Sequence, residues 1–149
     1  MFLGTGAVLA RPEVQLTVHG YVVHGTAQTP KLEEFSSAVA PRSGDTIEWK
    51  VVASNASADI ARKLVTTLPV APSTAFVAGS AAGSGDVVVT YSIDGGKTFA
   101  PRPMRVTHTA AGDVVKAADP STYTTVRWMQ ATDIGPKSTA TFSYEAKVK

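Results

Sequence analysis

Hydrophobic and polar residues alternate along most of the chain, and the final segment, 139–148, shows this most clearly. Its even-numbered residues are apolar or aromatic, whereas its odd-numbered ones are polar. Strict alternation with a period of two is typical of a strand that buries one face and exposes the other. The residues of the buried face are Ala140, Phe142, Tyr144, Ala146 and Val148.

The same pattern predicts an opening strand, in which Val14, Leu16 and Val18 face the core. Glu13, Gln15, Thr17 and His19 then face outward. Gly20 interrupts the alternation, and a glycine inside a strand often marks a bulge or a bend. The sequence therefore predicts a strand with an irregularity at Gly20.

Further strands follow at short intervals and are separated by turn-forming residues. Segments 47–53 and 87–93 each present one apolar face, and 94–97 (Asp-Gly-Gly-Lys) predicts a hairpin turn. No window repeats apolar residues at helical spacing, so no helix longer than a turn or two is expected. The pattern predicts an Ig-like antiparallel β-sandwich of seven or eight strands. The less regular stretch 101–120 is expected to be a long hairpin or an excursion from the sandwich.

Composition agrees with a sheet protein, since valine and threonine are abundant and only 17% of residues are charged. The chain has no cysteine, which excludes disulfides, thiolate metal sites and a cysteine nucleophile. The net charge is +2, and the basic residues are scattered rather than clustered. A nucleic-acid partner is not expected, because phosphate binding usually needs a clustered basic face.

The first twelve residues form an apolar segment that precedes the β-sandwich domain at 13–149. It is too short to span a bilayer. It also lacks the basic start of a signal peptide, so it is either the remnant of such a signal or a native arm. We expect the arm to dock on a partner chain, although packing on its own domain is the alternative. The docking residues would be Met1, Phe2, Leu3, Val8 and Leu9.

The order of short motifs along the chain resembles the DUF11 family, the Ig-like conserved-repeat domains of bacterial surface proteins. Ser43 stands where that family usually has proline, and only one copy is present. The resemblance implies an exported, non-catalytic structural subunit of a bacterial cell-envelope assembly of the surface-layer type. Its partners would be other envelope chains or further copies, and any membrane association would come through them. The segments that carry the resemblance are 43–49, 52–57, 64–69, 91–99, 126–128 and 135–142.

Candidate chemistry centres on three histidines, His19, His24 and His108. Imidazole is a common copper and zinc ligand, so the alternative hypothesis is a superoxide-dismutase-like β-sandwich. In a regular strand His19 and His24 would face opposite sides, and only a bulge at Gly20 would realign them. The chain also has no fourth histidine for the dismutase copper site. Solvent-facing histidines explain the pattern more simply, and no metal cofactor is expected.

Other site chemistries find little support in the sequence. No nucleophile-elbow motif is present, and no closely spaced aspartates form a calcium loop. Tyr21, Tyr91 and Tyr123 could form a stacking platform for a carbohydrate, although tyrosines of this kind more often pack in the interior. The sequence therefore favours an interaction module over an enzyme.

Overall fold

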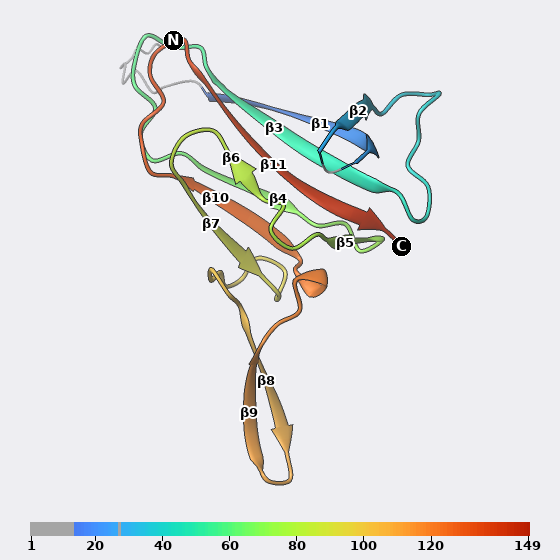
Figure 1. The fold of residues 1–149 in the computed structure, drawn as a ribbon. Coiled ribbons are helices and arrows are strands. Elements are labelled where there is room, and N and C mark those ends of the chain that lie inside the picture. The colour runs from blue at the N-terminus through green and yellow to red at the C-terminus, as the bar shows by residue number, and fades with distance from the viewer. Residues whose placement is uncertain (1–13, 27) are drawn as a thin grey trace, which may run out of the picture.

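The computed structural model describes residues 14–26 and 28–149, and its regular structure is almost entirely β-strand (Figure 1). All strand pairs are antiparallel. The expectation of an all-β antiparallel fold is confirmed. The strands are β1 (Val14–Gly25), β2 (Pro30–Glu34), β3 (Thr46–Asn55), β4 (Val65–Pro69), β5 (Thr74–Phe76), β6 (Ala82–Gly83), β7 (Val87–Ser92), β8 (Met104–Thr109), β9 (Gly112–Ala117), β10 (Thr125–Gln130) and β11 (Thr139–Val148).

The described residues form eleven strands, whereas the sequence predicts seven or eight. The difference comes partly from β5 and β6, which have three and two residues and are too short to show a period. A single 3₁₀ turn, η1 (Pro120–Thr122), is the only helical element in the described ranges. No helix there is long and apolar enough to cross a membrane.

Two sheets of unequal width face each other across the core. The larger sheet has the strand order β2-β1-β3-β11-β5, with β6 also pairing with β11. The smaller sheet contains three of the described strands, in the order β4-β10-β7. Burial of apolar side chains between the sheets is the main stabilising contribution.

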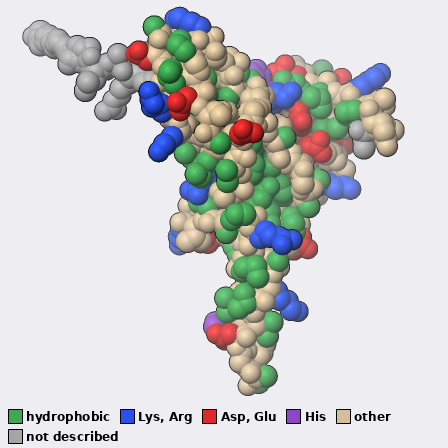
Figure 2. All heavy atoms as spheres, turned by 60° about the vertical axis from the view of Figure 1, so that its left-hand side comes forward, with side chains coloured by type: hydrophobic (Ala, Val, Ile, Leu, Met, Phe, Trp, Pro, Cys, Tyr) green, Lys and Arg blue, Asp and Glu red, His purple; other side chains and the backbone are tan. Residues whose placement is uncertain are grey.

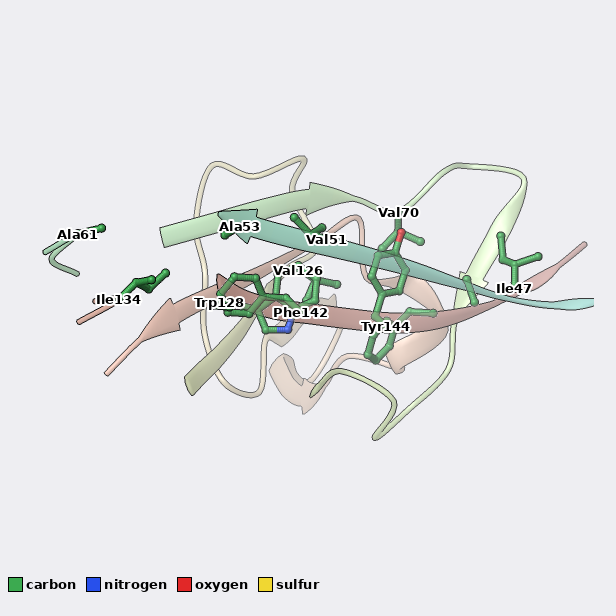
Figure 3. Packing of buried hydrophobic residues seen from close by; sticks show 13 residues of the cluster. Ile47, Val51, Ala53, Ala61, Val70, Val126, Trp128, Ile134, Phe142 and Tyr144 are labelled. Atoms are coloured by element: carbon green, nitrogen blue, oxygen red, sulfur yellow. The ribbon is translucent and has the colours of Figure 1, made fainter. Parts of the chain in front are cut away.

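The core is built from the apolar faces of β3, β10 and β11 (Figure 3). The rings of Trp128 and Phe142 lie 5.9 Å apart, and both side chains are fully buried. The expected apolar face of the last strand is confirmed, since Ala140, Phe142 and Tyr144 are buried. The indole Nε1 of Trp128 lacks a hydrogen-bond partner among the described residues, although a buried indole N–H usually has one.

Gly20 does not form the expected bulge, because β1 and β3 pair in continuous register from Val14 to Val23. The physical reason for glycine is close packing. A Cβ at this position would lie 2.4 Å from Phe35 Cε2 and 2.8 Å from Trp49 Cζ3. The rings of Phe35 and Trp49 meet edge to face here, with centroids 5.4 Å apart. Gly20 therefore makes room for an aromatic pair rather than bending the strand.

The stretch 101–120 forms both of the expected alternatives, since it is a long hairpin that leaves the sandwich. Within the described part of the chain, strands β8 and β9 pair only with each other, and they project from the body (Figure 1). The base of the hairpin is fixed by the buried residues Pro103 and Ala118, whose backbone atoms form a 2.8 Å hydrogen bond. The hairpin beyond this base has no support from either sheet.

The 94–97 turn forms, but the chain after it pairs with β7 at one residue only, Ala100, and does not continue as a second long strand. Tyr91 and Ala100 exchange two backbone hydrogen bonds of 2.9 and 3.0 Å. Gly95 and Gly96 both have positive φ, which glycine adopts at little cost. The chain then turns away into the β8–β9 hairpin.

Candidate interaction surfaces

The three candidate metal ligands lie in separate places. His19 and His24 are on opposite faces of β1, because the strand is regular and the two positions are an odd number, five, apart. His108 is near the tip of the β8–β9 hairpin. Within residues 14–26 and 28–149, no three metal-binding side chains gather at one point.

Each histidine instead contacts one carboxylate across a strand pair. His19 Nδ1 lies 2.7 Å from Glu34 Oε1, and His24 Nε2 lies 3.2 Å from Glu33 Oε1. His108 Nδ1 lies 2.6 Å from Asp113 Oδ1. Each pair offers two polar ligands at an exposed site, which is fewer than a structural or catalytic zinc site uses.

The carboxylate of Asp94, the acidic residue of the glycine turn, accepts hydrogen bonds from donors within its own loop. Oδ1 accepts hydrogen bonds from Ser92 Oγ and from the backbone N–H groups of Lys97 and Thr98, while Oδ2 accepts one from Thr98 Oγ1. The Ser92 hydroxyl, followed by the two Thr98 donors, holds the pKa of Asp94 well below its usual range. The carboxylate therefore organises the turn.

The candidate stacking tyrosines do not form a common platform. Tyr91 and Tyr123 stack on each other with ring centroids 4.5 Å apart, and both contact Phe76. Burial raises the pKa of Tyr91, and the neighbouring Tyr123 contributes to the shift. Tyr21 lies elsewhere, on β1, beneath the ammonium of Lys50. Tyr91 and Tyr123 thus contribute to packing at the end of the sandwich.

The β8–β9 hairpin has one largely apolar face, and its other face carries Arg105 and Lys116 together with Val114. All twelve residues of its strands are exposed. Because directly paired residues share a face, Met104 and Val106 lie beside Ala117 and Val115. Met104, Val106 and Val115 are 51%, 51% and 56% exposed. Figure 2 shows hydrophobic side chains along this narrow projection.

The opposite face of the hairpin places Arg105 directly across from Lys116. Like charges at such a position destabilise a strand pair rather than support it. An isolated two-stranded hairpin is also only marginally stable in water. The hairpin therefore exposes apolar surface without the packing that usually stabilises a strand pair.

A cavity of about 410 Å³ lies at the root of the hairpin and connects with its apolar face through Met104. Its apolar lining includes Ile93, Phe99 and Pro103. The cavity lies beside the turn that Asp94 organises, so the apolar face extends from the hairpin onto the body.

A second exposed apolar surface lies where the larger sheet extends past the smaller one. Leu16 and Val18 pair with Ala53 and Val51 and thus share the core-facing side of their sheet, as the sequence predicts. They are nevertheless 52% and 46% exposed, whereas Ala53 and Val51 are buried. The expected direction of these side chains is confirmed, but they are not buried.

The strand order explains this exposure. Strand β7 contacts β6, so β7 faces the edge of the larger sheet that β5 and β6 form. Strand β4, at the other edge of the smaller sheet, is therefore its strand nearest to β1. We call Leu16, Val18 and the outer edge of β4, which pairs with no strand in the described ranges, the open margin. A strand edge of this kind presents N–H and C=O groups that another strand can pair with.

The predicted docking residues Met1, Phe2, Leu3, Val8 and Leu9 lie outside the described residues. The sequence reasoning missed the two surfaces found here, although one signal for the hairpin was available. The spacing of Met104, Val106 and His108 marks one face of a strand, as does that of Val115 and Ala117. The open margin had no such signal, because its exposure depends on the width of the opposite sheet.

Comparison with protein-family models, with curated proteins and with solved structures finds no match to this chain.

Proposed function

We propose that this chain is a non-catalytic structural subunit that acts through protein–protein contacts. The observation that carries the proposal is the β8–β9 hairpin, which exposes three large apolar side chains on one face. A monomeric protein gains nothing from projecting such a surface into water, whereas an interface buries it. The open margin adds a second apolar surface, with a strand edge that no described residue pairs with.

The proposed setting is a bacterial cell-envelope assembly of the surface-layer type, reached by export. Support for this setting comes from the order of DUF11-like motifs, which also favours an Ig-like type of sandwich. The Thr- and Ser-rich outer face of β11, with Thr139, Thr141 and Ser143, suits an extracellular β module. A rigid sandwich would hold its edges and its hairpin in fixed directions for neighbouring chains.

Native mass spectrometry of the protein released gently from its source envelope tests this proposal, with metal analysis of the same sample. The expected result is a complex larger than one chain that lacks stoichiometric copper or zinc. A monomer carrying one equivalent of copper would contradict the proposal and support the dismutase-like alternative. A metal-free monomer at every concentration would also contradict it.

A further inference from the structure

The two apolar surfaces complement each other, because one lacks a covering strand and the other lacks a sheet. The larger sheet continues past β3 with β1, where the smaller sheet ends with β4. Strand β2 pairs with the Tyr21–Gly25 half of β1 and not with the half that holds Leu16 and Val18. The hairpin consists of two strands that belong to neither sheet. Among the described residues no strand covers Leu16 and Val18, and the two strands of the hairpin lack a sheet.

We propose that the hairpin of one copy docks in the open margin of a second copy of this chain. The inference rests on the proposed function and names the partner. One strand of the hairpin would pair with the free edge of β4, which extends the smaller sheet from three strands to five. The added backbone hydrogen bonds would be those of ordinary strand addition.

The faces of the hairpin fit this arrangement. Its apolar face, with Met104, Val106 and Val115, would turn toward Leu16 and Val18. The opposite face, with Arg105 and Lys116, would remain in water, where charged side chains stay hydrated. Burial of the apolar side chains on both copies would stabilise the contact.

No unpaired charge enters the proposed contact from the hairpin side. The polar side chains on the apolar face are His108 and Asp113 near the tip, and His108 Nδ1 lies 2.6 Å from the carboxylate of Asp113. On the receiving side, the first half of β1 contributes Val14, Leu16 and Val18 to the core-facing side of the sheet. The core-facing side of the second half of β1 is already covered, since Gly20 and Val22 are buried next to Phe35 and Val39.

The hairpin of a chain does not reach the open margin of the same chain. The hairpin projects from the end of the body where η1 lies (Figure 1). Leu16 and Val18 lie in the first half of β1, toward the other end of the body. The donor must therefore be another copy. Donor and acceptor surfaces differ, so the contact is head to tail and leaves one of each free at the ends.

Disulfide cross-linking tests the contact directly, because the chain has no cysteine of its own. The full-length variants Val106→Cys and Leu16→Cys are mixed under mild oxidation. The matched control replaces Leu16→Cys with Val88→Cys, on the outer side of β7, where the side chain is similarly exposed at 49%. The expected yield of mixed dimer is about tenfold higher than in the control, since docking raises the local concentration of the two thiols.

Two other cross-links would overturn the inference. A predominant Val106–Val106 dimer would show that two hairpins pack on each other. A predominant dimer between Leu16→Cys and Leu9→Cys would show that the N-terminal segment occupies the open margin. Either result would leave the proposed function standing, because both describe contacts between copies.

Leu16→Glu gives a second readout, since a carboxylate in the open margin would have to be dehydrated on docking. Self-association is expected to weaken about tenfold, whereas the matched variant Val88→Glu leaves it unchanged. Equal self-association in both variants would overturn the inference. Native mass spectrometry separates the two proposals. Complexes that form without the cross-link between positions 106 and 16 would refute the hairpin contact alone. Monomers at every concentration would refute both proposals.

Discussion

At the scale of single residues, one buried amide connects three parts of the chain at the end of β3. The side chain of Asn55 is fully buried, and its Nδ2 lies 2.7–3.2 Å from the carbonyl oxygens of Asp59, Ile134 and Gly135. Its Oδ1 accepts hydrogen bonds from the N–H and the hydroxyl of Ser57. Asn55 thus ties the loop after β3 to the loop before β11.

Replacing this amide should destabilise the protein far more than replacing its hydroxyl partner. Asn55→Ala removes five hydrogen bonds at a fully buried site and leaves a cavity there, so the free energy of unfolding should fall by about 2–4 kcal/mol. Ser57→Ala removes one side-chain partner and should cost about 1 kcal/mol. Urea denaturation followed by tryptophan fluorescence measures both. Equal values for the two variants would contradict this role of Asn55.

Tyr144 makes the stability depend on alkaline pH. Its side chain is 1% exposed and its hydroxyl donates a 2.9 Å hydrogen bond to the carbonyl of Pro69. Burial raises the pKa of Tyr144 to about 12 from its usual value of 10.0. The folded state therefore holds this proton more tightly than the unfolded chain does. The resulting stabilisation is complete below pH 10 and is lost as the pH rises toward 12.

The loss over this range should reach about 3 kcal/mol, because each unit of pKa corresponds to about 1.4 kcal/mol. In Tyr144→Phe this part of the pH dependence should disappear, at a cost of about 1 kcal/mol at neutral pH for the lost hydrogen bond. Denaturant titrations at neutral pH and at several values above pH 9 give the comparison. An unchanged alkaline slope in the variant would show that another group controls it.

The histidines show what sequence can and cannot predict at this scale. The parity of His19 and His24 along a regular strand already places them on opposite sides. Their carboxylate partners could not be predicted, because contact with Glu34 and Glu33 depends on the register between β1 and β2. That register is set by the turn and by pairing across the sheet rather than by local pattern.

At the scale of elements, Gly20 tests whether close packing explains glycine within β1. Gly20→Ala must push apart the ring of Phe35 and the ring of Trp49, so we expect a loss of about 1–3 kcal/mol in stability. Gly135→Ala is the matched control, since its added Cβ would meet only Ser138 Oγ at 3.5 Å. It should change stability by less than about 1 kcal/mol. Thermal unfolding followed by circular dichroism distinguishes the two, and a neutral Gly20→Ala would contradict the packing explanation.

The hairpin should be dispensable for folding of the body. Replacing residues 105–116 with a short Gly-Ser turn removes only exposed side chains and keeps the base at Pro103 and Ala118. The free energy of unfolding should change by less than about 1 kcal/mol, whereas self-association should be lost. Denaturant unfolding and size-exclusion chromatography with light scattering measure the two effects. Unfolding of the shortened protein would show that the hairpin belongs to the core structure.

Periodicity predicts most of the long elements correctly, because a strand that faces a core must alternate. The faces of β1, β3 and β11 all follow from it. It failed for β5 and β6, which are too short to repeat a pattern, and for Gly20, where the constraint is an aromatic pair from distant residues. Sequence pattern thus predicts which side of a strand is apolar, and tertiary packing decides whether that side is buried.

At the scale of the whole molecule, the unequal width of the two sheets matters most. The pattern of β1 correctly predicts the direction of Leu16 and Val18 but could not predict their exposure, because the smaller sheet ends before it covers them. A head-to-tail contact through this open margin has no built-in stopping point. The purified protein should therefore form a series of oligomers rather than one closed species.

Sedimentation velocity over a range of protein concentrations measures this distribution. The mean mass should rise steadily with concentration, and Leu16→Glu should shift the distribution toward the monomer, because its charge opposes docking. A single dimer or ring that stays constant over the whole range would contradict open assembly.

The exposed hairpin also links assembly to proteolysis. A strand pair held only at its base opens more easily than the body, and Arg105 and Lys116 offer cleavage sites to trypsin-like proteases. An unassembled copy would be cut there while its sandwich survived with the open margin intact. Such a trimmed copy would still accept a hairpin but would have none to donate. It would therefore terminate a growing chain, and the supply of trimmed copies would limit the length of the assembly.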